Sequence, residues 1–248
     1  MALREEWERS GELLFRWRSY PPLMLILLVI AAALVPGRVF IGGPAVEEWW
    51  ELFCLAVGVV GLLVRSHVVG HAPRGTSGRN TACGQVADTL NTTGWYSIVR
   101  HPLYLGNYLM WLGPIMVLRS PWAIIVMTLA FWLYYERIMY AEEEFLRRSF
   151  GEPWTAWAAN TPAFVPRLGG WQRATLPFCF RHVLKREYSG LFGLAAGFAF
   201  ADWVDDYSRY GAAAPDAVVL SVLISGAVMY VILRTMKRRT QLLDVAGR

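Results

Sequence analysis

The sequence predicts an all-α, polytopic integral membrane protein with about six transmembrane helices. Of its 248 residues 55% are hydrophobic and only 17% are charged, whereas soluble domains carry roughly 25% charged residues. The hydrophobic residues lie in long blocks, and a helix needs about 20 mostly apolar residues to cross a bilayer. The 24 Lys and Arg outnumber the 19 Asp and Glu. Because the bases flank the apolar blocks, they favour a membrane surface rather than nucleic acid as the partner.

Six segments have the composition of membrane spans, with few internal charges and with aromatic residues near their ends. They are residues 20–41, 49–64, 103–118, 122–140, 188–204 and 217–233. The fifth is rich in Gly and Ala and gives the weakest signal. Asp202, Asp205 and Asp206 are expected to cap it, with a cation site as the alternative.

The distribution of basic residues predicts the orientation of these spans. All but three of the Lys and Arg residues fall on one side, and the exceptions are Arg38, Arg119 and Arg209. Loops rich in Lys and Arg stay in the cytosol. We therefore expect both termini and the long segments 65–100 and 137–187 to be cytosolic, with the working surface on that side.

No metal site or disulfide framework is expected. Cys54, Cys83 and Cys179 are odd in number and far apart. His67 and His71 have the i, i+4 spacing of two ligands on a helix, but no third ligand lies near them in the sequence.

A polar corner is predicted where the third span begins. Arg100 and His101 precede Pro102, and proline suits the first turn of a helix because its missing N–H would be unpaired there. Such a helix end attracts anions, and Arg100 strengthens the field. The alternative is an ordinary helix cap with Arg100 reaching to lipid phosphate.

A second candidate lies where the fourth span leaves the membrane. Glu136, Tyr140 and Glu143 share one helical face, and Glu142 borders it. Ionisable groups near an apolar run usually face a cavity or each other. The alternative is that these acidic residues face solvent and have no specific role.

Together the motifs DTLNTTGWYSIVRHPLYLG, EEEFLRRSFGEPW and TPAFVP resemble the isoprenylcysteine carboxyl methyltransferase family of membrane enzymes, which use S-adenosylmethionine. The resemblance implies cofactor-binding residues at Asp88, Thr89, Leu90, Asn91, Tyr96, His101, Pro102, Leu103, Tyr104 and Glu142. An arginine near the cytosolic end of the fourth span contacts the acceptor in that family, and Arg137 is the nearest candidate here. Arg100, Arg137, Glu142 and Glu143 are the candidate catalytic residues.

The flanks LFRWRSYPPL, GHAPRGTSGRNT, LKREYSGLFGL and KRRTQLLDVAGR are similar to bacterial lipid A 1-phosphate methyltransferases of the same superfamily. This likeness implies a bacterial inner-membrane protein that methylates a lipid phosphate. The alternative acceptor is the carboxylate of a prenylated cysteine. Trp154 and Trp157 depart from the tyrosines usual in the family, so the acceptor pocket is expected to differ. Outside the enzyme class, the alternatives are a small transporter and a non-catalytic scaffold; the oligomeric state stays open.

The expected organisation is one membrane domain over residues 1–248. It comprises two spans and a cytosolic loop (1–87), a catalytic core (88–166) and a C-terminal helix pair (167–248). In the core, methyl transfer to an oxygen that is already anionic needs alignment and little water rather than a general base. Arg100 or Arg137 is expected to hold that oxygen, and Glu142 and His101 are expected to hold polar groups of the cofactor.

Overall fold

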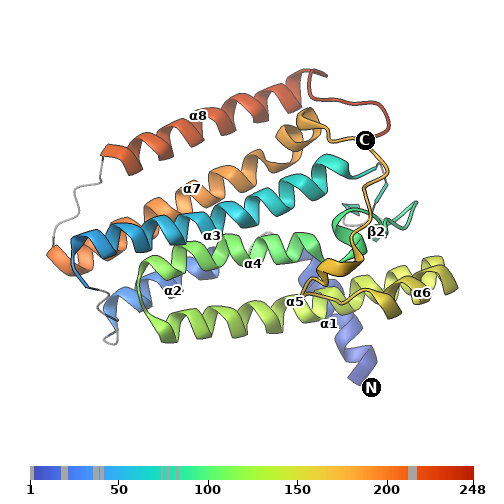
Figure 1. Ribbon diagram of the computed structural model, residues 1–248, viewed down its shortest axis with the longest axis horizontal. Helices are drawn as coiled ribbons and strands as arrows, with labels where there is room; N and C mark the ends of the chain where they lie inside the picture. Colours follow the sequence, from blue (N-terminus) through green and yellow to red (C-terminus); the bar gives the residue numbers. More distant parts are fainter. Residues whose placement is uncertain are drawn as a thin grey trace.

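A computed structural model describes residues 3–17, 22–35, 39, 42–73, 75–76, 79–81, 84–211 and 217–248 (Figure 1). Over these residues the chain forms helices and one short two-stranded hairpin. The helices are α1 (Leu3–Trp17), α2 (Pro22–Leu34), α3 (Pro44–His71), α4 (Pro102–Val117), α5 (Pro121–Phe150), α6 (Glu152–Asn160), α7 (Phe180–Tyr210) and α8 (Ala217–Arg239). The hairpin pairs β1 (Arg79–Thr81) with β2 (Gly84–Val86). The predicted all-α membrane fold is confirmed.

Each predicted span falls on a helix, and α2, α3, α4, α5, α7 and α8 run roughly along one direction (Figure 1). Within the described residues, length and apolar composition qualify three of them as candidate spans: α3 from Ala45, α5 and α8. The apolar stretch of α2, Met24–Leu34, is shorter, and part of the first predicted span lies outside the described residues. The helix positions were therefore predictable, whereas six complete crossings remain a prediction.

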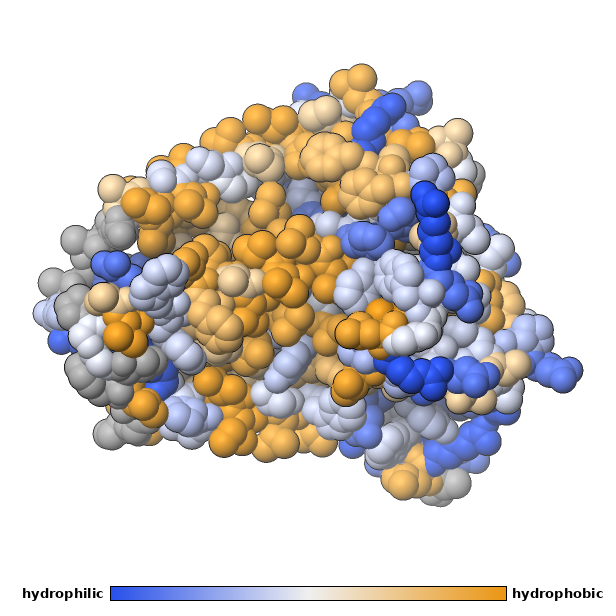
Figure 2. Space-filling model, viewed as in Figure 1, coloured by the Kyte–Doolittle hydropathy of each residue, from blue (hydrophilic) through white to orange (hydrophobic). Residues whose placement is uncertain are grey.

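The outer surface of this bundle is apolar. Large hydrophobic side chains are exposed along the helices, among them Leu27, Leu63, Leu133 and Val218, each at least 60% exposed. Figure 2 shows hydrophobic residues over the middle of one face and hydrophilic ones gathered at the end that carries α6. In water such a belt would be costly to expose, so it marks the lipid-facing surface.

The Arg-rich segments collect at one end of the bundle. Helix α1, the hairpin, α6 and the chain's C-terminal segment all lie there (Figure 1). Arg119 and Arg209 share the other end, where both pair with Glu47. This separation agrees with the charge distribution of the sequence; the assignment of the Arg-rich end to the cytosol stays a prediction.

The prediction that Asp205 caps the fifth span is wrong, because α7 continues to Tyr210 and keeps Asp205 inside the helix. Its carboxylate lies 3.2 Å from Arg119 Nη2 and 3.0 Å from Arg209 Nε. Arg119 is 3% exposed and also pairs with Glu47 at 3.0 Å. These ion pairs join the ends of α3, α4 and α7 opposite the Arg-rich end.

Helices α3 and α4 pack closely because glycines line their interface. A Cβ on Gly61 would lie 2.5 Å from the carbonyl oxygen of Gly106, and one on Gly106 would lie 2.5 Å from Arg65 Cγ. Only hydrogen atoms fit at these positions, so the two backbones approach as small residues allow within membranes. The contact also fixes the place of Arg65.

We expect Gly61→Ala to lower stability by about 1–3 kcal/mol, because its Cβ would overlap backbone atoms of α4 and force the helices apart. For a chain of this size the melting temperature in detergent should fall by about 5 °C. Gly226→Ala in α8 is the matched control, since its nearest neighbour would lie at an ordinary 3.6 Å. Equal melting temperatures for the two variants would contradict the close packing.

Candidate active site

A cavity of about 1140 Å³ opens between the helices at the Arg-rich end. Its polar part is walled by residues at the start of α4 and along α5, including His101 and Glu142. Its apolar part is lined by Leu25 and Val29 of α2 and by Phe200 of α7. One continuous space therefore meets both charged groups and the apolar interior of the bundle.

Most of the predicted site residues line this cavity. They are Thr89, Leu90, Asn91, Tyr96, Arg100, His101, Pro102, Leu103, Tyr104, Glu142 and Glu143. Asp88 is not among the lining residues, and its backbone N–H donates to the carbonyl of Gly75 at 2.8 Å. Arg137 is also not among them: it donates to Ser10 at 3.3 Å and lies 6.0 Å from the ring of Trp7. The structure thus places Arg137 against α1.

The polar corner is held in place by the segment that follows α6. The N–H of Arg100 donates to the carbonyl of Pro162 at 2.8 Å, and the N–H of His101 donates to that of Ala163 at 3.1 Å. His101 then caps α4, which begins at Pro102 as predicted. The TPAFVP motif therefore serves as a backbone strap that fixes the start of α4.

Arg100 clamps three elements together. Its Nε donates to Glu143 at 2.8 Å, and its Nη1 donates to the carbonyls of Ala158 and Thr161, both at 2.8 Å. Its Nη2 reaches the second oxygen of Glu143 at 3.3 Å. Because every guanidinium nitrogen has a protein partner, this geometry favours a structural role over the predicted contact with an acceptor.

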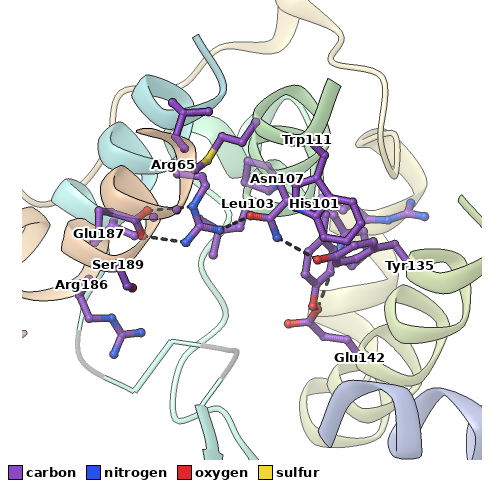
Figure 3. A pocket seen from close by; sticks show the side chains of 18 of the residues that line it. Arg65, His101, Leu103, Asn107, Trp111, Tyr135, Glu142, Arg186, Glu187 and Ser189 are labelled. Carbon is purple, nitrogen blue, oxygen red and sulfur yellow. Dashed lines mark hydrogen bonds and ion pairs between the residues drawn. The ribbon is translucent and has the colours of Figure 1, made fainter. Parts of the chain in front are cut away.

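Glu142 presents its carboxylate to the cavity. Tyr104 donates its hydroxyl to Oε2 at 3.0 Å, and His101 Nδ1 lies 3.7 Å from the same oxygen. His101 itself is 5% exposed, stacks on Tyr104 and contacts Glu143 through Nε2 at 2.8 Å. A carboxylate has about four acceptor sites, so Glu142 can also accept hydrogen bonds from a ligand (Figure 3).

Two tryptophans complete this part of the wall. Trp157 donates its indole N–H to the carbonyl of Tyr96 at 2.9 Å. Trp154 is 8% exposed, and its indole N–H has no hydrogen-bond partner among the described residues. Trp154 lines the cavity, so its indole N–H is available to an acceptor atom bound there.

Tyr96 is a cavity-lining phenol whose ionisation is disfavoured. Burial, together with the nearby Glu142 carboxylate, raises the pKa of Tyr96 well above its usual value. A phenol is neutral below its pKa, so raising the pKa extends the neutral form further into the alkaline range.

We expect Tyr96→Phe to leave the phenolate absorbance gained between about pH 9 and 11 unchanged, because Tyr96 does not ionise over that range. Alkaline titration of the folded protein in detergent measures this change. The chain has 11 tyrosines. If Tyr96→Phe lowers the absorbance change by the share of one tyrosine, the raised pKa of Tyr96 is contradicted.

Sequence reasoning missed four hydrogen-bonded side chains that line the cavity, those of Arg65, Asn107, Tyr135 and Glu187. Arg65 of α3 donates through Nε and Nη2 to the two oxygens of Glu187, each at 2.8 Å. Its Nη1 donates to Asn107 at 2.6 Å, and Asn107 donates to the hydroxyl of Tyr135 at 3.2 Å. Figure 3 shows this row of side chains crossing the cavity. Arg65 and Glu187 each border an apolar block in the sequence, where a charge normally marks only the end of a span.

A metal centre is not formed by the described residues. They contain no group of three or more His, Cys, Asp or Glu side chains arranged to hold an ion. The rings of His67 and His71 do meet, at 4.6 Å, but His71 Nδ1 lies 2.7 Å from the carbonyl oxygen of Leu176. The pair therefore packs beside the segment that precedes α7.

The model of one protein family, described as phospholipid methyltransferase, matches residues 53–153. Among curated proteins, the cobalt-zinc-cadmium resistance protein CzcN of Cupriavidus metallidurans is 42% identical over 34% of this chain and 39% of its own length. The nickel-cobalt-cadmium resistance protein NccN of Alcaligenes xylosoxydans is 30% identical over 58% of this chain and 62% of its own length. Protein-S-isoprenylcysteine O-methyltransferase B of Arabidopsis thaliana is 29% identical over 57% of this chain and 72% of its own length.

The similarity is therefore partial. The chain spans 39% and 62% of the lengths of the two resistance proteins. The family match covers α4, α5 and most of α3 but neither α7 nor α8. No solved structure matches the chain significantly. The matched segment holds most of the polar wall of the cavity, whereas Glu187 lies outside it.

Proposed function

We propose that this chain is a membrane methyltransferase of the isoprenylcysteine methyltransferase-like kind and that it transfers a methyl group from S-adenosylmethionine to an anionic oxygen of a lipidic acceptor. The match of residues 53–153 to the phospholipid methyltransferase model and the similarity to protein-S-isoprenylcysteine O-methyltransferases support this proposal. The observation that carries this proposal is the cavity itself. It joins the polar corner of His101 and Glu142 to an apolar space between α2 and α7. A soluble donor and a lipid acceptor need a shared space of this kind.

The polar part of the cavity suits S-adenosylmethionine. Glu142 has acceptor capacity for its ammonium or hydroxyl groups, and the start of α4 favours its carboxylate. The indole N–H of Trp154 offers a buried donor to a ring nitrogen, and Leu103 and Tyr104 supply apolar surface. When bound, the cofactor supplies an electrophilic methyl group on its sulfonium.

The chain's own contribution is to align the two partners and exclude water. The strap and the Arg100 clamp fix the start of α4, so the groups that bind the cofactor are held before it arrives. A phosphate or carboxylate is already anionic at neutral pH, so no side chain has to remove a proton. Positioning and desolvation account for the acceleration in this scheme.

Two acceptors follow from different parts of the sequence. The name of the Arabidopsis relative, a protein-S-isoprenylcysteine O-methyltransferase, favours the carboxylate of an isoprenylcysteine. The resemblance of the flanking segments favours a lipid phosphate such as the 1-phosphate of lipid A. Both present an anionic oxygen on an apolar anchor, and nothing in the described residues favours the transporter or scaffold alternatives.

The test begins with calorimetric titration of S-adenosylmethionine into the detergent-purified protein, where we expect saturable binding. Lipids and lipidated peptides from cells with and without the protein are then compared by mass spectrometry for the gain of one methyl group. A methylated lipid phosphate and a methylated prenylcysteine distinguish the two acceptors. Absence of cofactor binding by folded protein would overturn the proposal.

A further inference from the structure

The pairing of Arg65 with Glu187 has the geometry of an occupied oxyanion site. Two guanidinium nitrogens meet two carboxylate oxygens, each at 2.8 Å, and the side chains of Arg65 and Glu187 are 21% and 6% exposed. An arginine fork binds the oxygens of a phosphate or of a substrate carboxylate in the same two-point manner. Glu187 therefore holds the position that an anionic ligand would take.

Arg65 lies where the polar and apolar parts of the cavity meet. On one side Asn107 links it to Tyr135, whose ring packs 4.8 Å from that of Tyr104, the partner of Glu142 (Figure 3). On the other side the cavity continues along α7, where a Cβ on Gly193 would meet nothing within 4 Å. An apolar chain lying along α7 would place its head group at Arg65.

The other arginines are less suitable for this contact. Arg100 is engaged by Glu143 and by two backbone carbonyls, and Arg137 faces α1. The cavity wall also holds two further cations, Arg186, which lies beside Glu187 (Figure 3), and Lys237. Arg186 belongs to α7 and Lys237 to α8, and the family match covers neither helix.

We propose that Arg65 binds the anionic head group of the acceptor and that Glu187 occupies Arg65 until the acceptor displaces it. This proposal rests on the proposed function, since it assigns the acceptor subsite of the same cavity. Exchange of one carboxylate for another anion keeps the partly buried guanidinium of Arg65 paired throughout. The displaced Glu187 carboxylate has Arg186 near it in the cavity wall (Figure 3). Specificity for anionic over neutral lipids follows from the same exchange.

The experiment measures binding of three lipid probes to the protein saturated with S-adenosylhomocysteine, the demethylated form of the cofactor. The probes are phosphatidic acid (a phosphate monoester), N-acetyl-S-farnesylcysteine (a carboxylate) and neutral phosphatidylcholine. The variants are Glu187→Gln, Arg65→Gln and the double variant. The control is Arg209→Gln, whose arginine is similarly exposed at 25% and is also paired with carboxylates, at the far end of the bundle.

Glu187→Gln should tighten binding of an anionic probe several-fold, because the competing charge is gone while the shape is kept. Arg65→Gln and the double variant should weaken it about tenfold or more. Binding of phosphatidylcholine and of the cofactor should stay as in the unmodified protein, and Arg209→Gln should change neither. The double variant carries the test if Arg65→Gln alone does not fold, because it leaves no buried charge unpaired.

Unchanged affinity for both anionic probes in the folded double variant would overturn the proposal and make the pair a structural clamp. Weaker anion binding by Glu187→Gln would also overturn it. The anionic probe whose affinity changes in the variants shows whether the site takes a phosphate or a carboxylate head group. Failure of the proposed function is distinguished by the cofactor titration, because it would remove cofactor binding from the unmodified protein as well.

Discussion

His101→Ala should raise the dissociation constant of S-adenosylmethionine by about 10- to 100-fold, as expected when a buried hydrogen bond to a charged group is lost. The imidazole is 5% exposed and lies between Glu142 and Glu143. Its ring also stacks on Tyr104, which donates to Glu142. Removing it therefore takes away a polar contact and loosens the carboxylate that we expect to bind the cofactor.

The fold should tolerate this change, because Glu143 keeps its two contacts with Arg100. His71→Ala is the matched control, since His71 is also partly buried and hydrogen-bonded but does not line the cavity. Calorimetry in detergent gives both dissociation constants, and the melting temperature checks folding. Equal cofactor affinity in the two variants would remove His101 from the site.

The polar corner was predictable because its signals are local in the sequence. Proline after His101 marks the helix start, and helical periodicity puts Glu142 and Glu143 near the emerging end of the next span. These segments lie about 40 residues apart, and the short connection from α4 to α5 brings them together. Whether the residues bind a cofactor is a separate question, which the titration above addresses.

Arg65 and Glu187 were not predictable in this way. They are 122 positions apart, and nothing in one sequence says that α7 lies beside α3. The same lack of long-range information affects Arg100 and Arg137. Sequence reasoning offered both as ligands of the acceptor, whereas their partners in the fold decide which way each guanidinium points.

The predicted spans are shorter than the helices that contain them for a different reason. Hydrophobicity marks the part of a helix that lies in the bilayer, whereas hydrogen bonding continues into polar segments. Helix α5 accordingly runs ten residues past residue 140, where the predicted span ends, and α7 continues past the fifth predicted span to Tyr210. The continuation of α5 places Glu142 and Glu143 on a rigid helix, and that of α7 brings Asp205 to Arg119.

Arg119→Ala should lower stability by about 3–5 kcal/mol, because it removes a buried guanidinium and leaves the buried Asp205 and the partly buried Glu47 paired with Arg209. Asp205 and Glu47 lie 3.2 and 3.0 Å from its guanidinium. A loss of this size lowers the melting temperature of a chain this long by about 10 °C or more. Arg209→Ala should cost less, since its side chain is 25% exposed against 1% for Arg119.

The backbone of Arg119 allows the charge and the conformation to be separated. Its φ of 53° lies in the left-handed region, which costs a residue with a Cβ about 1–2 kcal/mol and costs glycine little. Arg119→Gly should therefore be less destabilising than Arg119→Ala by about 1 kcal/mol, although both remove the same charge. A melting temperature of Arg119→Gly about as much above that of the unmodified protein as the relieved backbone strain predicts would show that the ion pairs contribute nothing, whereas equal melting temperatures would limit their contribution to about 1 kcal/mol. A cofactor affinity unchanged in both variants is expected too, because these ion pairs lie at the far end of the bundle from the cavity's polar corner.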